Sequence, residues 1–414
     1  MNPHFSRSRF PIALFLSFLI VAGCSKNDNI PVGPGTVVPN DATVRLDSMG
    51  QRIRGFGGVS MPDWIPDLTT AQVHEAFGAG NGQIGLTILR VRVPYDETQF
   101  SLEVPTAALA YSLGATIFAS PWTPPDSMKT NHNIVGGALK TSSYASYASH
   151  LKAFADYLSS NNAPLYAISI QNEPDASVNY ESCYWSAAQM LNFVKNNASA
   201  IGLKIIMPES ENFNHALSDP TLNDAGAAAN VSIIGGHLYG GGLAAYPLAM
   251  SKGKEVWMTE HLDTDTSWTA VIGTAKEIND CMKAGMNAYV WWYIRRFYGL
   301  IDENGNITKR GYVMSQYARF VRPGYTLVEA SGGTGSNVDI TAYRNGSSIV
   351  IVLVNRNAYT IYQTISIPNS TATSFSCYTT SPAKNCSQEG NVSGSSGTFT
   401  TLLDPSSVTT LVSN

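Results

Sequence analysis

The stretch ISIQNEPD, residues 168–175, alternates two isoleucines around a small serine and then ends in amide, amide, carboxylate and proline. The alternation is typical of a buried strand. Such a strand has no structural need to finish on Asn172 and Glu173. Polar side chains at the carboxyl end of an apolar strand are typical of parallel sheets, in which the strand ends carry the functional groups.

Seven further segments have the same apolar or β-rich character, so the sequence predicts eight strands. The predicted strands span residues 54–60, 87–93, 116–122, 166–171, 203–209, 231–239, 255–260 and 287–294. Stretches with helical period separate most of them, such as 143–160, 185–202 and 267–285, where Ser143, Ser186 or Ser267 can start the helix and Gly202 or Gly285 can end it. The alternation predicts an α/β fold with a (β/α)8 barrel over residues 54–322. An open doubly wound sheet is the competing topology, but no Gly-rich phosphate loop follows the first strand.

The pattern changes after Pro323. Residues 323–414 contain short alternating segments rich in Thr and Ser, separated by turn residues, which predicts an all-β sandwich. The strand-like segment 42–53 precedes the barrel and is expected to complete this sandwich from the other end of the chain.

The N-terminus has the composition of a targeting segment. Basic residues precede the apolar run 12–21, and VAGC ends at Cys24, which resembles a bacterial lipobox. Residues 1–24 are therefore interpreted as a lipoprotein signal peptide, and the Pro-, Gly- and Asn-rich residues 25–41 as a flexible tether. We expect an exported lipoprotein of the outer membrane of a Gram-negative bacterium. An ordinary cleaved signal with an incidental cysteine is the alternative.

Composition restricts the partners. Lys and Arg number 26 against 30 Asp and Glu, a net charge of -4, which predicts no basic face for nucleic acid. The cysteines have no metal-site spacing, and neither a metal nor a cofactor is expected. Cys377 and Cys386 flank the turn-rich SPAKN, which suggests a disulfide between them, with free structural cysteines as the alternative; the state of Cys183 and Cys281 is left open. The chain is expected to act as a monomer.

Two carboxylates lie at the ends of predicted barrel strands, Glu173 on the fourth and Glu260 on the seventh. A proton donor and a nucleophile on either side of an anomeric carbon are what hydrolysis of a glycosidic bond requires, about 5–5.5 Å apart in a retaining enzyme. Asn172 can then hydrogen-bond a neighbouring sugar hydroxyl. The alternative for Glu173 alone is a helix-capping carboxylate.

Other strand ends carry weaker signals. Trp122 is a sugar platform or a core residue. His237 and Tyr239 position the nucleophile, with a structural histidine as the alternative. Glu209 is assigned a supporting role only.

These motifs resemble a known family. QNEP on the fourth strand and TEH on the seventh look like clan A glycoside hydrolases, and the whole of residues 43–414 resembles glycoside hydrolase family 30. RGFGG, LRVRVPY, ASPWTPP, SIQNEPD, YESCYW and WWYIRRFYG together resemble its glucuronoxylanase subfamily. The resemblance implies a barrel with a side β-sandwich built from both chain ends. It also implies a retaining endo-β-1,4-xylanase in which Glu173 is the acid/base and Glu260 the nucleophile.

The resemblance further implies recognition of a 4-O-methylglucuronic acid branch on xylan. The positions that match the family's branch pocket are Arg296, Tyr298 and Trp292, and an arginine can grip a carboxylate with two hydrogen bonds. One position departs from the pattern, because Leu262 stands where typical members have a tyrosine. Asp263 and Asp265 in the same loop would repel a uronate if they pointed toward it.

Three functions are therefore weighed. The first is a retaining xylanase directed by glucuronate branches. The second is the same scaffold acting on unsubstituted xylan or another β-glycan, such as a β-1,6-glucan or a glucosylceramide-like substrate. The third is a non-catalytic glycan-binding surface lipoprotein, which gives no reason for both glutamates to be present.

Overall fold

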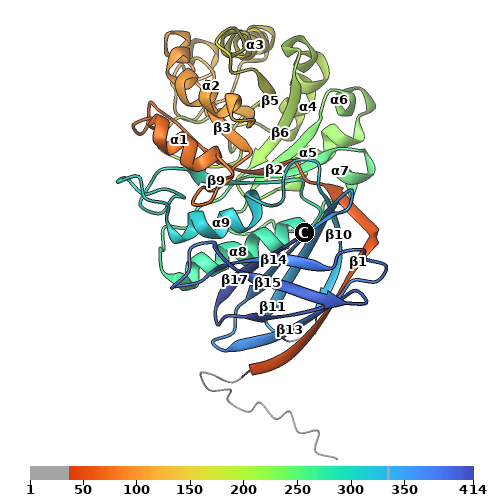
Figure 1. Ribbon diagram of the computed structural model, residues 1–414. Coiled ribbons are helices and arrows are strands. Elements are labelled where there is room, and N and C mark those ends of the chain that lie inside the picture. The colour runs from red at the N-terminus through yellow and green to blue at the C-terminus, as the bar shows by residue number, and fades with distance from the viewer. Residues whose placement is uncertain (1–36, 333–335) are drawn as a thin grey trace, which may run out of the picture. The chain divides into compact units, whose positions relative to one another are not determined.

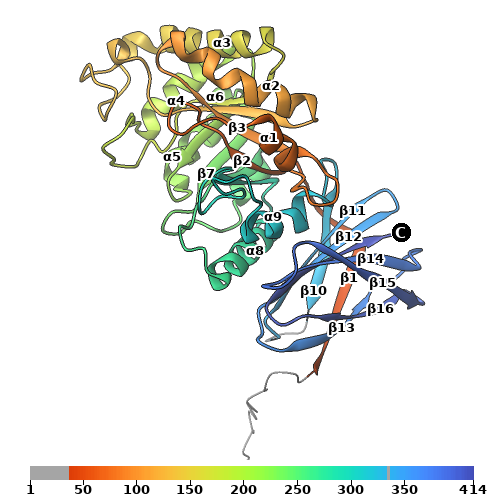
Figure 2. The same cartoon turned by 60° about the vertical axis from the view of Figure 1, so that its left-hand side comes forward.

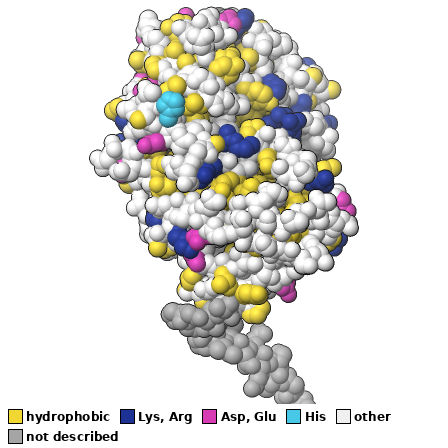
Figure 3. Space-filling view, viewed as in Figure 1, with side chains coloured by type: hydrophobic (Ala, Val, Ile, Leu, Met, Phe, Trp, Pro, Cys, Tyr) yellow, Lys and Arg dark blue, Asp and Glu magenta, His cyan; other side chains and the backbone are white. Residues whose placement is uncertain are grey.

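The computed structural model describes residues 37–332 and 336–414, which form two closed β structures (Figures 1 and 2). Cys24, the predicted signal peptide and most of the predicted tether lie outside the described residues. Within the described part of the chain, none of the helices has the length and apolar character needed to cross a membrane. Charged side chains are sparse on the face shown in Figure 3, in keeping with a charged fraction of 14%.

The first structure is a barrel of eight parallel strands in sequential order, which confirms the predicted (β/α)8 fold. Each observed strand falls on a predicted segment, with ends that differ by a few residues. The strands are β2 (Gly55–Val59), β3 (Ile88–Val93), β4 (Thr116–Pro121), β5 (Leu165–Ser169), β6 (Lys204–Ser210), β7 (Ile233–His237), β8 (Glu255–Glu260) and β9 (Ala288–Tyr293).

Helices connect the barrel strands and cover the outside of the barrel (Figure 1). The α-helices are α1 (Thr70–Phe77), α2 (Val104–Ser112), α3 (Tyr144–Ser160), α4 (Ala187–Asn196), α5 (His215–Asn223), α6 (Ala225–Ala229), α7 (Pro247–Ser251), α8 (Trp268–Lys283) and α9 (Lys309–Ala318). Short 3-10 turns are η1 (Glu97–Glu103), η2 (Asp126–Met128), η3 (Thr141–Ser143) and η4 (Ala198–Ile201).

The predicted helix starts lie where expected. Ser186 caps α4 in a reciprocal capping box with Gln189, and Ser267 accepts a hydrogen bond from the backbone of α8. Ser143 precedes α3 but its side chain makes no capping bond. Gly202 ends η4 in the left-handed conformation that favours glycine.

Apolar side chains fill the lower part of the barrel interior. Phe118 and Trp257 meet there edge to face with ring centroids 5.7 Å apart, and Ile88, Ile206 and Ile233 complete the layer. Because this part is packed, only the carboxyl ends of the strands are left to form a cavity.

The second structure is the predicted sandwich, closed along both edges. Its strand order is β1-β10-β11-β12-β17-β14-β15-β16-β13, with β13 pairing back onto β1. The strands are β1 (Val37–Arg52), β10 (Thr326–Gly332), β11 (Val338–Asn345), β12 (Ser348–Asn355), β13 (Thr360–Ser366), β14 (Ser374–Thr380), β15 (Ser387–Ser395), β16 (Thr398–Leu403) and β17 (Ser407–Ser413).

Strand β1 begins earlier than predicted. Residues 37–41, assigned from the sequence to the tether, already pair in parallel with β13. Asn40 is buried there and donates a hydrogen bond to Gln363, with 2.7 Å between the nitrogen and the oxygen. Pro and Asn suggested a tether, but the ladder with β13 overrides these local preferences.

The predicted disulfide between Cys377 and Cys386 is wrong, because both are buried free thiols. Cys377 belongs to the apolar core of the sandwich. Cys386 lies next to Thr380, whose hydroxyl accepts a hydrogen bond from the Cys386 backbone, and its sulfur is 3.8 Å from Arg319. Residues 377 and 380 point to opposite faces of β14 because side chains alternate along a strand. The two sulfurs therefore lie on different sides of the sheet. Cys183 and Cys281 are also buried and free.

Candidate active site

A cavity of about 390 Å³ opens at the carboxyl ends of the barrel strands. Glu173, from the end of β5, and Glu260, the last residue of β8, both face it. Its other walls are formed by Trp64, Tyr180, Glu211, Tyr239, Leu262, Trp292 and Tyr293. The two predicted catalytic carboxylates therefore share one sugar-sized space.

The two carboxylates lie close together. One side-chain atom each of Glu173, His237 and Glu260 falls within 4.8 Å of the other two. Glu173 is 7% exposed and Glu260 is 5% exposed, so both are held in a largely water-free setting. This separation is close to the roughly 5–5.5 Å of a retaining pair and shorter than the roughly 6.5–9.5 Å of an inverting pair.

Arg90 on β3 is the centre of the site and was not singled out from the sequence. Its guanidinium donates to Glu260 Oε2 and to Asn172 Oδ1, the latter at 2.6 Å, and Nε donates to Ser120 at 3.0 Å. It also lies 3.1 Å from Glu209 Oε1. The signal that could have revealed it is a pair of arginines, Arg90 and Arg92, that alternate with apolar residues in a predicted barrel strand.

Glu260 is held as a carboxylate by two donors. Arg90 binds one of its oxygens, and the Tyr239 hydroxyl donates to the other at 2.8 Å. Burial raises the pKa of the Glu260 carboxyl, while the charges of His237 and Arg90 act in the opposite direction and Glu173 adds to the rise. Glu260 therefore titrates above an ordinary glutamate, and the two cations limit the rise of its pKa.

His237 at the end of β7 contacts Glu173, with 2.9 Å between Nδ1 and Oε1. Burial opposes a charge on this ring, but the carboxylates of Glu260, Glu173 and Glu209 outweigh burial and raise the His237 pKa to about 9. The ring is therefore an imidazolium at neutral pH and donates a hydrogen bond from Nδ1 to Glu173. His237 contacts the predicted acid/base more closely than the nucleophile, which is 3.9 Å away.

Glu209 supports the site without facing it. It is fully buried, and although burial favours its neutral form, Arg90 and His237 lower the pKa of its carboxyl to about 2. A permanent charge at this position balances Arg90 and His237. This agrees with the supporting role expected from the sequence.

The backbone at the two strand ends is unusual. Glu173 and Glu209 both have φ in the left-handed region, at 42° and 51°. The Glu173 N–H donates to the Glu209 carbonyl at 3.0 Å, which ties the two loops together. Non-glycine residues in this region cost free energy and are held by their surroundings, as is common in active sites.

Trp122 and Asn172 lie beneath the cavity. Trp122 is 2% exposed, and Arg90 stacks on its ring at 4.8 Å, so it offers a substrate little surface and instead positions Arg90. The platform interpretation from the sequence is not supported by this burial. Asn172 is 3% exposed, with its side-chain oxygen bonded to Arg90, which leaves its amide nitrogen available for a sugar hydroxyl.

The predicted branch pocket lies at the end of β9. Trp292 lines the cavity, whereas Arg296 and Tyr298 follow it in the next loop. The two adjacent arginines differ: Arg295 donates to the carbonyl of Pro66 at 2.9 Å, while the Arg296 side chain is 43% exposed and its nearest carboxylate, Glu303, is 3.9 Å away. Arg295 is the structural member of the pair.

Four cavity residues were missed by sequence reasoning: Trp64, Tyr180, Glu211 and Tyr293. Trp64 and Tyr180 meet edge to face at 5.7 Å, and both come from long loops without periodicity. Leu262, flagged as a departure from the family pattern, does line the cavity.

The cluster of Glu173, His237 and Glu260 has the spacing of metal ligands. Metal binding requires a neutral imidazole, but His237 has a pKa of about 9. Arg90 already neutralises Glu260. The donor set therefore fits proton transfer better than a metal.

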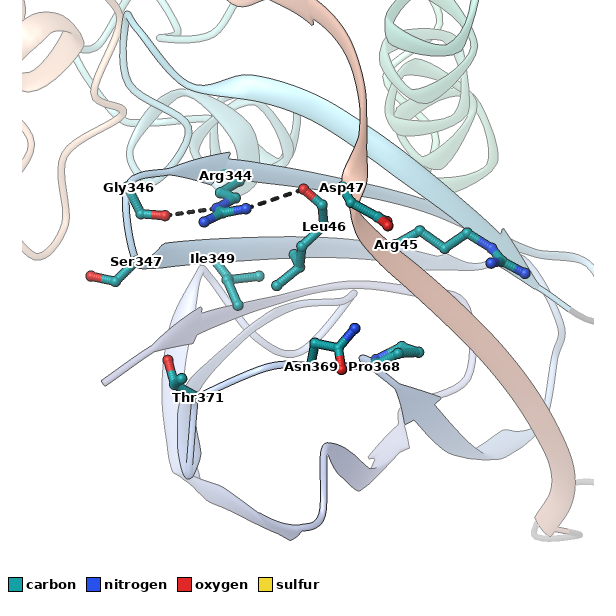
Figure 4. A pocket seen from close by; sticks show the side chains of 10 residues that line it. All are labelled: Arg45, Leu46, Asp47, Arg344, Gly346, Ser347, Ile349, Pro368, Asn369 and Thr371. Atoms are coloured by element: carbon teal, nitrogen blue, oxygen red, sulfur yellow. Dashed lines mark hydrogen bonds between the residues drawn. The ribbon is translucent and has the colours of Figure 1, made fainter.

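A second cavity, also about 390 Å³, lies in the sandwich (Figure 4). Arg344 spans it and donates to the carbonyl oxygens of Gly346 and Leu46, so its guanidinium is largely occupied. Its lining includes Arg45 and Asp47 and contains no aromatic side chain on which a sugar could stack.

Comparison with known proteins gives consistent matches. Residues 86–254 match the family described as the glycosyl hydrolase family 30 TIM-barrel domain. Glucuronoxylanase XynC of Bacillus subtilis (strain 168) is 39% identical over 404 residues, 93% of this chain and 95% of that protein. The glycoside hydrolase family 30 subfamily 8 xylanase Xyn30A of Clostridium acetobutylicum has 42% identity and a TM-score of 0.86, with 90% of this chain and 99% of that chain covered. A GH30 endoxylanase of Clostridium papyrosolvens C71 has 37% identity and a TM-score of 0.84. The match covers 90% of this chain and 100% of that chain.

Proposed function

We propose, from the premise that this chain belongs to glycoside hydrolase family 30, that it is a retaining endo-β-1,4-xylanase that cuts glucuronoxylan under the direction of 4-O-methylglucuronic acid branches. The observation that carries the hydrolytic part is the pair of carboxylates, Glu173 and Glu260, with side-chain atoms within 4.8 Å in one cavity. The substrate class is supported by the relatives, which are named as a glucuronoxylanase and xylanases.

In the first step, a Glu260 oxygen forms a bond to the anomeric carbon as the bond to the leaving oxygen breaks. The Glu173 carboxyl gives its proton to that oxygen, so the leaving chain departs neutral. Arg90 and Tyr239 aim the nucleophile, because each holds one of the two Glu260 oxygens. The cation of His237, 2.9 Å from Glu173, stabilises the carboxylate that proton transfer creates.

In the second step, the Glu173 carboxylate takes a proton from a water molecule. The water oxygen attacks the anomeric carbon from the side that the leaving chain vacated, and the bond to Glu260 breaks. Two inversions give net retention. Proton NMR of the first product should therefore show the β-anomer, and an α-anomer would exclude this mechanism.

Branch recognition rests on Arg296. Its side chain is 43% exposed, and within the described part of the chain its one carboxylate partner is Glu303, at 3.9 Å, a long and solvent-screened contact. A branch carboxylate can therefore replace this contact with a two-pronged hydrogen bond. Tyr298 follows two residues later with its ring edge to face against Phe297, and Trp292, at the end of β9, forms part of the cavity wall.

Leu262 favours a second candidate, hydrolysis of unsubstituted xylan. This side chain lines the cavity and has no hydroxyl to give to a uronate. Because the pocket then has fewer hydrogen-bond donors, the branch contributes less binding energy. The difference in kcat/KM between branched and unsubstituted xylan is therefore smaller. The second candidate differs from the first in substrate preference and not in chemistry.

Side-by-side digestion of branched glucuronoxylan and branch-free xylan tests the proposal. We expect singly branched acidic products in a regular ladder, and we expect Arg296→Ala to lower kcat/KM on branched xylan at least tenfold more than on linear xylan. Arg356→Ala is the matched control, because it also removes a partly exposed arginine with one carboxylate partner, but in the sandwich. Equal rates of the wild type on both polymers would favour the second candidate.

We also propose that the protein is a monomeric lipoprotein anchored through Cys24 in the outer membrane of a Gram-negative cell. The proposal is supported by the VAGC sequence and the basic and apolar segments before it. Palmitate labelling of the wild type but not of Cys24→Ser, with recovery of label in the outer-membrane fraction, would bear this out. Unlabelled wild-type protein would contradict it.

A further inference from the structure

Glu211 is a third carboxylate in the wall of the catalytic cavity, and the mechanism does not use it. It follows the end of β6 and is partly exposed. Among the residues that the structure describes, no side chain donates a hydrogen bond or forms an ion pair with its carboxylate. By contrast, Glu209 is paired with Arg90, and Glu181 with Arg92.

The backbone around Glu211 is firmly fixed. Its N–H donates to Asp175 Oδ1 at 3.1 Å, and Asp175 also accepts from the Ser210 hydroxyl at 2.7 Å. Its carbonyl accepts from the Tyr239 N–H at 3.0 Å. An unpaired charge on a rigid loop, aimed into a binding cavity, is available for a substrate and is not a flexible surface group.

Glu211 lies on the side of the cleft where the leaving chain must bind. Glu173 protonates the leaving oxygen, and Asp175, two residues after it, holds the Glu211 loop. In the barrel, β6 neighbours β5, and Glu173 lies in the loop that follows β5. Arg296 follows β9, which lies on the other side of β8 and Glu260. The proposed branch-binding cation and this anion therefore flank the nucleophile from opposite sides.

The surroundings of Glu211 are already acidic. Tyr180 is 41% exposed, and the pKa of its hydroxyl is raised first by partial burial and then by the carboxylates of Glu173, Glu260 and Glu211. A uronate carried by the first sugar of the leaving chain would add another negative charge here. Like-charge contacts in a partly desolvated site are strongly unfavourable.

We propose that Glu211 is a specificity-determining residue, which accepts hydrogen bonds from hydroxyls of an unbranched leaving-group sugar and rejects a sugar that carries a uronic acid branch. This inference rests on the proposed function and adds a second rule to it. Arg296 binds the branch that directs the cut, and Glu211 excludes a branch from the first sugar of the leaving chain. Together they fix the cut relative to each branch from both sides.

The exclusion of a branch from the leaving-group sugar can be tested with xylooligosaccharides of defined length. Each carries one glucuronate branch and an 18O label at its reducing end. Mass spectrometry of the products gives the fraction of cuts that leave the branched sugar at a new non-reducing end. We expect almost none of these cuts for the wild type and an increase of at least tenfold for Glu211→Gln, which keeps the shape and removes the charge. An unchanged unfolding midpoint verifies that the variant is folded.

Glu97→Gln is the matched control. Glu97 is an exposed glutamate in η1, after β3, and its carboxylate contacts His150 and not the cavity. It should leave the cut distribution as in the wild type. The proposal is overturned if Glu211→Gln keeps the wild-type distribution, if Glu97→Gln changes it equally, or if the wild type already cuts with the branched sugar on the leaving side.

The same products separate this inference from the proposed function. The position of the branch counted from the new reducing end reports on Arg296, and the absence of a branch at the new non-reducing end reports on Glu211. A wild type that cuts linear and branched chains equally, yet never leaves a branched sugar at a new non-reducing end, would refute branch direction while supporting the role of Glu211.

Discussion

At the scale of single residues, the nucleophile Glu260 depends on donors that favour its charged form. Burial raises its pKa, so the acidic limb of the activity profile is expected above the pKa of an ordinary glutamate. Activity is lost as the pH falls through this value, because the protonated carboxyl cannot attack. The Tyr239 hydroxyl, 2.8 Å from Oε1, works against the rise.

Tyr239→Phe removes that hydrogen bond while keeping the ring. The charged form of Glu260 loses a donor, so its pKa rises and the acidic limb of kcat/KM moves to higher pH. We expect a plateau rate lower by about ten- to a hundredfold as well, since the attacking oxygen is less well oriented. Tyr246→Phe, a buried tyrosine bonded to Asp219 outside the cavity, is the control. An unmoved limb would show that Tyr239 does not tune Glu260.

At the scale of secondary-structure elements, β3 supplies two buried arginines that pair with carboxylates in and around the site. Its sequence ILRVRV places Arg90 and Arg92 on the same face, because side chains two apart point the same way. Arg90 binds the catalytic carboxylate, and Arg92 joins Asp63 from the loop after β2 to Glu181 from the loop after β5. One strand thereby organises loops from several others.

Arg90→Met should be costly in two ways. It leaves buried carboxylates of Glu209 and Glu260 without their cation, and breaking a buried pair in this manner destabilises by about 3–5 kcal/mol. Urea unfolding measures this loss. Activity should fall by at least a hundredfold because Glu260 loses its orientation. An unfolding free energy within about 1 kcal/mol of the wild type would contradict a structural role for the pair.

The positions of strands and helices could be predicted from the sequence wherever apolar residues recur with a regular period. Strand ends at Glu173, His237 and Glu260 could be located because apolar alternation stops there, and strand order then placed them at one mouth. Arg90 was recoverable in principle, as a charge inside an apolar strand. Trp64 and Tyr180 were not, because they lie in long loops without periodicity, and neither was Glu211, because the path of its short loop after β6 depends on tertiary hydrogen bonds to Asp175.

At the scale of the whole molecule, barrel and sandwich share polar and apolar contacts. Gln316 of α9 donates to Thr380 at 2.8 Å and accepts from Thr410 at 2.7 Å, and Trp268 donates to Ser406. The composition change after Pro323 revealed the second domain. It could not reveal these contacts or the faces that Cys377 and Cys386 occupy, since both depend on the exact alternation along β14.

Because the four buried cysteines are free thiols, the thermal stability of the protein should not depend on a reducing agent. A native disulfide stabilises a protein by about 2–4 kcal/mol, so reducing one lowers Tm by several degrees. Because Cys183, Cys281, Cys377 and Cys386 are unpaired, we expect a reducing agent to leave Tm unchanged. Differential scanning calorimetry with and without dithiothreitol checks this. A clear drop under reducing conditions would restore a disulfide.

The position of β1 makes both ends of the chain interdependent. Asn40 and Gln363, hydrogen-bonded neighbours in the sandwich, are 323 residues apart in sequence, and β1 covers the edges of both β10 and β13. A ribosome must therefore release almost the entire polypeptide before this seam can close, and until then two bare strand edges can pair with other molecules. A truncated protein that begins at the first barrel strand, β2, would lack β1. Its sandwich would keep two unpaired edges, and we expect most of the protein to aggregate.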